Sequence, residues 1–125
     1  MKAYTDLEQS RKLAEILPLK TADMCYRIVA YNPNDTQEYQ AYCFVGTLES
    51  DIPCWSLDSL LNYFREIDFF PEIDADECSV TMNINYYDEE EARLLAPIHN
   101  IKVKAESFID ACYEMIIKLH EQKVL

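Results

Sequence analysis

Cys54 occupies the setting in this sequence that most resembles that of a catalytic nucleophile. It stands with Trp55 directly before a predicted helix. A thiol at a helix N-terminus can have a lowered pKa, and a cysteine followed by an aromatic residue is typical of papain-like nucleophiles. His99, oriented by Asn100, would have to act as the base. Because the chain is short and lacks the glycines of that motif, a core cysteine beside a helix-anchoring tryptophan is the favoured interpretation, and a Cys54-dependent hydrolase is an alternative.

Two acidic runs offer carboxylates for catalysis or for metal binding. Asp88 to Glu91 follow a predicted strand, and four adjacent acids cannot all point into one pocket. The run DADE at 74–77 resembles a calcium loop only faintly, because Cys78 and Ser79 stand where such a loop needs an oxygen ligand and a glycine. We therefore expect both runs to be solvated connections.

Other standard sites are poorly represented in the sequence. Gly46 is its single glycine, so neither a P-loop nor a dinucleotide-binding fingerprint can form in its standard version. His99 and His120 are the two histidines, and they do not form an H-x-x-x-H pair. The five cysteines contain no C-x-x-C motif, so neither a zinc ribbon nor a thioredoxin-type site is indicated. Their odd number and the lack of a visible export signal indicate reduced thiols. We expect no catalytic, cofactor-binding or metal-binding residues, no cofactor and no enzymatic activity.

Three amphipathic helices are predicted, each from a capping residue followed by an apolar stripe. The first starts with a capping box of Thr5 and Glu8 and is stopped by Pro18. Ser56 caps the second helix and Ser107 caps the last. The expected core positions are Leu7, Leu13, Ala14, Ile16 and Leu17, then Leu57, Leu60, Leu61 and Phe64, then Phe108, Cys112, Met115, Ile116 and Leu119.

Four segments have the composition of β-strands. Residues 24–31 and 38–46 flank turn residues and predict a hairpin. Residues 78–87 alternate apolar and polar side chains, and 100–104 form a short strand. The segment 68–77 is predicted to be an acidic connection. The order α-β-β-α-β-β-α indicates an α+β fold with three helices and a small, mostly antiparallel sheet of about four strands.

Length and charge restrict the class of protein further. A chain of 125 residues suggests a single domain spanning residues 1–125. Its 23 acidic and 11 basic residues give a net charge of −12, which disfavours direct nucleic-acid binding. An acidic nucleic-acid mimic that inhibits a DNA-binding enzyme stays open as an alternative. Since neither an export signal nor a membrane span is visible, we expect a cytoplasmic protein that does not enter the membrane.

Three helical stretches carry a resemblance to a known family: 4–19, 52–64 and 109–125. Together they resemble a family of small acidic proteins of uncharacterised function from anaerobic gut bacteria, their phages and mobile elements. The resemblance implies a cytoplasmic protein of phage or mobile-element type and assigns no functional residue. Of the nine tyrosines, seven gather around the predicted sheet and second helix: Tyr26, Tyr31, Tyr39, Tyr42, Tyr63, Tyr86 and Tyr87. The leading hypothesis is a non-enzymatic interaction module that binds a protein partner, or itself as a homodimer, through a sheet face or edge bearing tyrosines.

Overall fold

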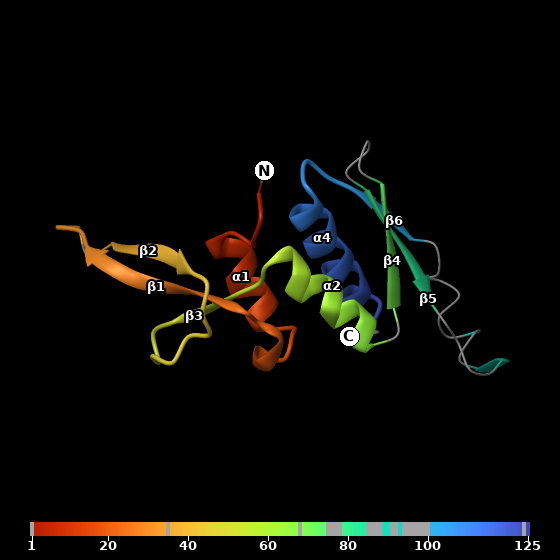
Figure 1. Ribbon diagram of the computed structural model, residues 1–125, viewed down its shortest axis with the longest axis horizontal. Coiled ribbons are helices and arrows are strands. Elements are labelled where there is room, and N and C mark those ends of the chain that lie inside the picture. Colours follow the sequence, from red (N-terminus) through yellow and green to blue (C-terminus); the bar gives the residue numbers. More distant parts are fainter. Residues whose placement is uncertain are drawn as a thin grey trace.

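The chain folds into helices and two small sheets. The computed structural model describes residues 2–34, 36–67, 69–74, 79–84, 89, 90, 93, 101–123 and 125. In chain order the elements are α1 (Leu7–Ala14), the 3-10 helix η1 (Leu19–Thr21), β1 (Met24–Tyr31), β2 (Gln37–Tyr42), β3 (Ile52–Cys54), α2 (Leu57–Glu66), β4 (Phe69–Asp74), β5 (Ser79–Ile84), β6 (Lys102–Lys104) and α4 (Phe108–Glu121). Figure 1 shows the sheets at opposite ends of the long axis, with α1, α2 and α4 between them. The predicted α+β class is confirmed.

The prediction of one sheet with about four strands is wrong. The described residues form two antiparallel sheets of three strands, in the orders β2-β1-β3 and β4-β5-β6. The order α-β-β-α-β-β-α therefore lacks one strand in each half. β3 is short and contains Pro53, and β4 contains Pro71 and falls within the segment 68–77 that was expected to be a connection. Both are edge strands, where the missing N–H of a proline can face away from the ladder.

The remaining strand predictions are confirmed, and the first strand of the hairpin has the predicted bounds, 24–31. The second strand of the hairpin ends at Tyr42 rather than at residue 46. β5 and β6 lie inside the predicted 78–87 and 100–104; Cys78, residues 85–87 and Asn100 are outside the described residues. Val80 and Val103 are buried, as the alternation predicts. Ser79 is also buried, although its face of the strand was expected to be exposed to solvent.

Two of the three predicted helix N-caps are observed, and the third is replaced by a neighbouring residue. Ser56 and Ser107 cap α2 and α4 as predicted, each accepting a hydrogen bond from a backbone N–H three residues on. The predicted box of Thr5 and Glu8 is wrong, because Asp6 and Gln9 form the capping box of α1. Thr5 is fully buried and hydrogen-bonds to other groups, so it is not available as a cap.

One apolar core joins the helices to the β4-β5-β6 sheet. Its largest fully buried side chains are Trp55, Phe64, Leu13, Leu60, Ile109, Met115, Ile116 and Leu119. Burying a large apolar side chain contributes about 1.5–3 kcal/mol, so this cluster is the main source of stability. Within the described part of the chain, the core cluster includes no residue of β1 or β2. The two strands therefore project beyond the core, as Figure 1 shows.

The longest of the described helices, α4, has 14 residues. None of them combines the length and the apolar content that crossing a bilayer requires.

Candidate functional site

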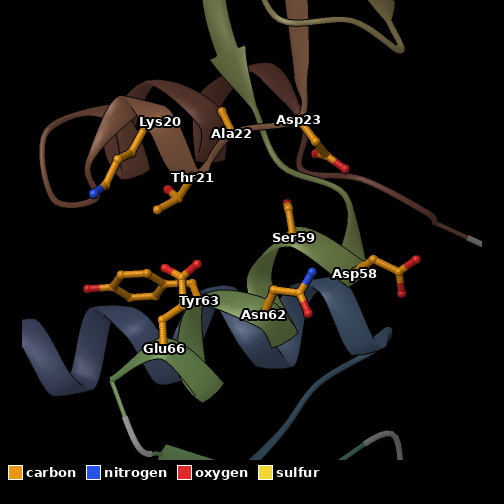
Figure 2. A pocket seen from close by; sticks show the side chains of 9 residues that line it. All are labelled: Lys20, Thr21, Ala22, Asp23, Asp58, Ser59, Asn62, Tyr63 and Glu66. Atoms are coloured by element: carbon orange, nitrogen blue, oxygen red, sulfur yellow. The ribbon is translucent and has the colours of Figure 1, made fainter.

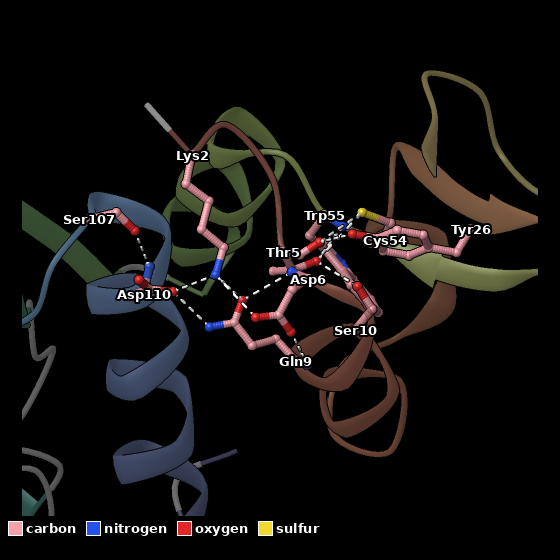
Figure 3. A network of polar contacts seen from close by, with 10 residues as sticks. All are labelled: Lys2, Thr5, Asp6, Gln9, Ser10, Tyr26, Cys54, Trp55, Ser107 and Asp110. Atoms are coloured by element: carbon pink, nitrogen blue, oxygen red, sulfur yellow. Dashed lines mark hydrogen bonds and ion pairs between the residues drawn. The ribbon is translucent and has the colours of Figure 1, made fainter. Parts of the chain in front are cut away.

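Cys54 lies in a buried hydroxyl cluster at the end of β3. Its Sγ is 3.6 Å from Thr5 Oγ1 and 3.5 Å from the Thr5 carbonyl oxygen. Thr5 Oγ1 also lies 2.8 Å from Ser10 Oγ and accepts a hydrogen bond from the backbone N–H of Trp55. Figure 3 shows these groups converging between the N-terminal segment and β3. The cluster fastens residue 5 to the start of α2.

The chemistry of Cys54 in this cluster is that of a protected thiol. The side chain is fully buried, and this burial raises the pKa of its thiol. The sequence argument required the opposite, a thiol whose pKa is lowered at a helix N-terminus. His99 and Asn100, the proposed base and its orienting residue, lie outside the described residues.

The other cysteines differ mainly in exposure. Cys25 and Cys112 are buried free thiols, whereas Cys43 is an exposed free thiol; Cys78 is outside the described residues. Burial raises the pKa of Cys112 to about 12. Buried thiols of this kind behave as small apolar residues.

A second polar network joins α1 to α4. Lys2 Nζ lies 2.7 Å from Asp110 Oδ1 and 3.2 Å from Asp6 Oδ2, and it donates to Gln9 Oε1. Gln9 Nε2 also donates to Asp110 Oδ1 at 2.8 Å, as drawn in Figure 3. Although burial opposes ionisation, the hydrogen bonds from Lys2 and Gln9 hold the pKa of Asp110 below its ordinary value. These bonds are all used within the molecule, so this network is structural.

A polar cleft of about 230 Å³ separates η1 from α2. Figure 2 shows Asp23 and Thr21 on one side, facing Asp58 and other polar side chains of α2. Asp23 accepts the backbone N–H of Ser56 at 3.0 Å and contacts its hydroxyl, and Trp55 Nε1 donates to Thr21 Oγ1 at 2.9 Å. The polar groups of this cleft thus hold the beginning of α2 in place.

The acidic runs give no metal site in the part of the chain that the structure describes. Within those residues, no three histidine, cysteine, aspartate or glutamate side chains are placed to hold an ion. Glu89 and Glu90 are exposed and helical, and Asp74 ends β4 with an exposed side chain. Asp88, Glu91 and residues 75–77 lie outside the described residues.

The most distinctive surface belongs to residues 24–51, which comprise β1, β2 and the loop 43–51 and are called the arm below. The register of β1 against β2 shifts just after Ile28, so that Val29 is an extra, bulged residue. An extra residue reverses the faces of the positions that follow, and Tyr31 therefore lies on the same face as Tyr26 and Ile28. Tyr39, opposite Ile28, belongs to this face too.

This tyrosine face of the arm is partly supported and partly open. The Tyr26 hydroxyl donates to the Thr5 carbonyl at 2.8 Å, and the rings of Tyr4 and Tyr26 meet edge to face at 6.4 Å. The Arg11 guanidinium lies 5.5 Å from the centre of the Tyr39 ring. Among the described residues Tyr31 has no such support, and it is 71% exposed. Tyr26, Tyr31 and Tyr39 of the predicted hairpin thus share one face of the arm.

The loop 43–51 is the last part of the arm, and it folds over the face of β1 and β2 that lies opposite the tyrosine face. A buried carboxylate holds it there. Arg27 donates to Asp51 from Nε at 2.9 Å and from Nη2 at 2.8 Å, and the Leu48 backbone N–H donates to Asp51 Oδ2. The hydrogen bonds from Arg27 hold the pKa of Asp51 down at about 2. The Arg27 guanidinium also covers the Phe44 ring, 5.0 Å from its centre.

Gly46 allows this loop to approach the sheet. A Cβ at that position would lie 2.7 Å from Asp51 Cβ and 3.1 Å from Cys25 Cβ, both too close for ordinary contact. The single glycine of the sequence therefore stands where any side chain would displace Asp51. It was the one signal that pointed to this loop, and reasoning from the sequence used it only to exclude phosphate-binding motifs.

Comparison of the chain with protein-family models, with curated proteins and with solved structures gives no match. The resemblance to small acidic proteins of gut bacteria and their phages stays a prediction. What the surface of this protein does must be inferred from its own geometry.

Proposed function

We propose that the protein is a non-enzymatic interaction module that binds a partner protein through the arm. The supporting observation is where the exposed apolar side chains lie. Eight large ones are exposed among the described residues, and five belong to the arm: Val29, Tyr31, Phe44, Val45 and Leu48. Leu19 and Tyr4 border the arm, and Ile73 lies on β4. Scattered apolar residues need no explanation, but a concentration of them is typical of a protein interface.

The distribution of charge favours the same end of the molecule. Residues 57–93 contain eleven acidic and two basic side chains, whereas residues 1–56 contain eight acidic and five basic ones. Most of the net charge of −12 is therefore carried by α2 and the segments that follow it. A partner that binds the arm therefore desolvates fewer charged side chains than one that binds residues 57–93, called the acidic half below.

The tyrosine face has the chemistry of a protein-binding surface. Tyr31 and Tyr39 present large rings with polar tips, which bury much area at a small cost in side-chain entropy. The support of Tyr39 by Arg11 keeps part of the surface ordered before binding. A partner protein is therefore preferred, with a homodimer as the alternative occupant.

The nucleic-acid mimic is supported less well by the described part of the acidic half. Glu72 and Lys102 lie on one face of the second sheet, on either side of Thr81. Two strand spacings, about 10 Å, separate the backbones of these oppositely charged residues. A mimic needs a surface of one sign, and this one is mixed.

Capture experiments with paired variants test the proposal. The tagged protein should retain a specific partner from an extract of the organism that encodes it, and the double variant Tyr31→Ser, Tyr39→Ser should lose that partner. Ile73→Ser is the matched control, because it removes an exposed apolar side chain from the other sheet. Circular dichroism confirms that each variant is folded. A strict monomer by light scattering, together with no specifically retained protein, would contradict the proposal.

A further inference from the structure

An apolar groove of about 430 Å³ runs between the loop 43–51, η1 and the first residues of β1. Its floor is formed by Ala22, Met24 and Cys25, which are all buried. Its rim carries three exposed apolar side chains: Leu19 at 59%, Val45 at 61% and Leu48 at 54%. The volume falls within the usual range of binding pockets, and it matches one or two large side chains of a ligand.

The wall of this groove is held before any ligand arrives. Asp51 accepts two hydrogen bonds from Arg27 and one from the Leu48 backbone N–H. Its carboxylate is 3% exposed. The close approach of Gly46 to Cys25 and Asp51 seats the loop against β1. A preformed wall lowers the ordering cost of binding, which favours a short ligand segment.

The charge on the rim of the groove favours a ligand with a positive charge. Glu49 lines the groove with an exposed carboxylate that has no ion-pair or hydrogen-bond partner among the described residues. Arg27, the basic residue of the arm, is engaged by Asp51. A cationic group beside the bound apolar side chain would therefore meet an unpaired carboxylate at the rim. A second copy of this chain carries the same net charge and is disfavoured.

From these observations we infer that the groove binds a short segment of another protein in which a large apolar side chain stands next to lysine or arginine. The apolar side chain covers Met24 and Cys25 between Leu19 and Leu48, and the cation pairs with Glu49. This inference rests on the proposed function, because it names the chemistry of the partner for the same arm.

Fluorescence anisotropy with synthetic peptides tests the inference without a known partner. The probe is a short labelled peptide with one tryptophan flanked by lysines. Two matched peptides replace the lysines by glutamates or the tryptophan by serine. The lysine–tryptophan peptide should bind saturably, and both matched peptides should bind at least about tenfold more weakly.

Variants of the protein locate the binding. Leu48→Ser should weaken the lysine–tryptophan peptide by about tenfold, because it removes one rim of the groove. Glu49→Gln should weaken it about two- to fivefold, the size of an exposed ion pair. Glu121→Gln, on α4, is the control for nonspecific attraction to the acidic surface and should have no effect.

Three results would overturn the inference. These are the absence of saturable binding, binding that ignores Leu48→Ser and Glu49→Gln, and a dimer in light scattering that Leu48→Ser converts into a monomer. The last result would identify a second copy as the occupant. If no peptide binds but capture through the tyrosine face succeeds, the proposed function stands and the groove inference falls. If peptides bind while the tyrosine variants retain the captured partner, the tyrosine face is not the binding surface, and the groove inference stands.

Discussion

At the scale of single residues, Asp51 links the loop 43–51 to β1 through an ion pair with Arg27. Its carboxylate is nearly buried, and it accepts hydrogen bonds from Nε and Nη2 of Arg27 and from the Leu48 backbone N–H. A buried charge is tolerated only with this degree of satisfaction. The geometry of the arm therefore depends on Asp51 being ionised.

The ionisation of Asp51 predicts how stability changes with pH. Its pKa is about 2 in the folded protein and has the ordinary value of 3.8 when unfolded, so protonation favours the unfolded chain. The ionised Asp51 contributes fully to the free energy of unfolding above pH 3.8, and this contribution is lost as the pH falls towards 2. Urea unfolding across this range should show a steeper fall for the wild type than for Asp51→Asn.

A second variant checks the cause of that slope. Arg27→Gln removes the donor that lowers the pKa of Asp51 and should flatten the same pH dependence. Equal slopes for the wild type and Asp51→Asn would show that other carboxylates govern acid unfolding.

At the scale of elements, the network at Asp110 predicts how α1 and α4 stabilise each other. Asp110→Ala removes the acceptor of Lys2 Nζ and Gln9 Nε2 and an acidic side chain from the first turn of α4. The expected loss in free energy of unfolding is about 1–2 kcal/mol, because the pair is partly exposed. Glu114→Ala, one turn later and exposed, is the matched control. A loss no larger than that of the control would mean that the packing of the helices alone holds them together.

Elements with local signals were predictable from the sequence, and those defined by pairing were not. The apolar stripes and serine caps of α2 and α4 lie within their own segments, so the pattern located both helices. β3 and β4 exist because β1 and β5 supply hydrogen-bonding partners for them. Such pairing overrides the weak strand propensity of segments with proline and acidic residues.

The candidate surfaces show the same division between local and distant signals. The tyrosines of the hairpin were visible in the sequence, but a bulge at Val29 decides which of them share a face. The groove combines Leu19, Met24 and Leu48, which are ordinary apolar residues when taken one at a time. Only the folding of the loop onto β1 brings them together, and Gly46 is the one residue in the sequence that points to that contact.

At the scale of the whole molecule, the division between core and arm predicts a gradient of local stability. The core cluster joins α1, α2 and α4 to the second sheet, and among the described residues it includes none from β1 or β2. Opening the arm would therefore expose little of the apolar surface that holds the protein together. Regions with few buried apolar contacts open at lower free energy than the global unfolding reaction.

Hydrogen exchange measured by mass spectrometry tests this gradient. The amides of β2 should exchange at least about tenfold faster than those in the middle of α4, since α4 contributes Cys112, Met115 and Ile116 to the core. Binding of the lysine–tryptophan peptide should slow exchange in loop 43–51 and β1 and leave α4 unchanged, because the ligand stabilises only the closed arm. Equal exchange rates in β2 and α4 without peptide would mean that the molecule opens as one unit. In that case the arm could not be ordered by a partner independently of the core.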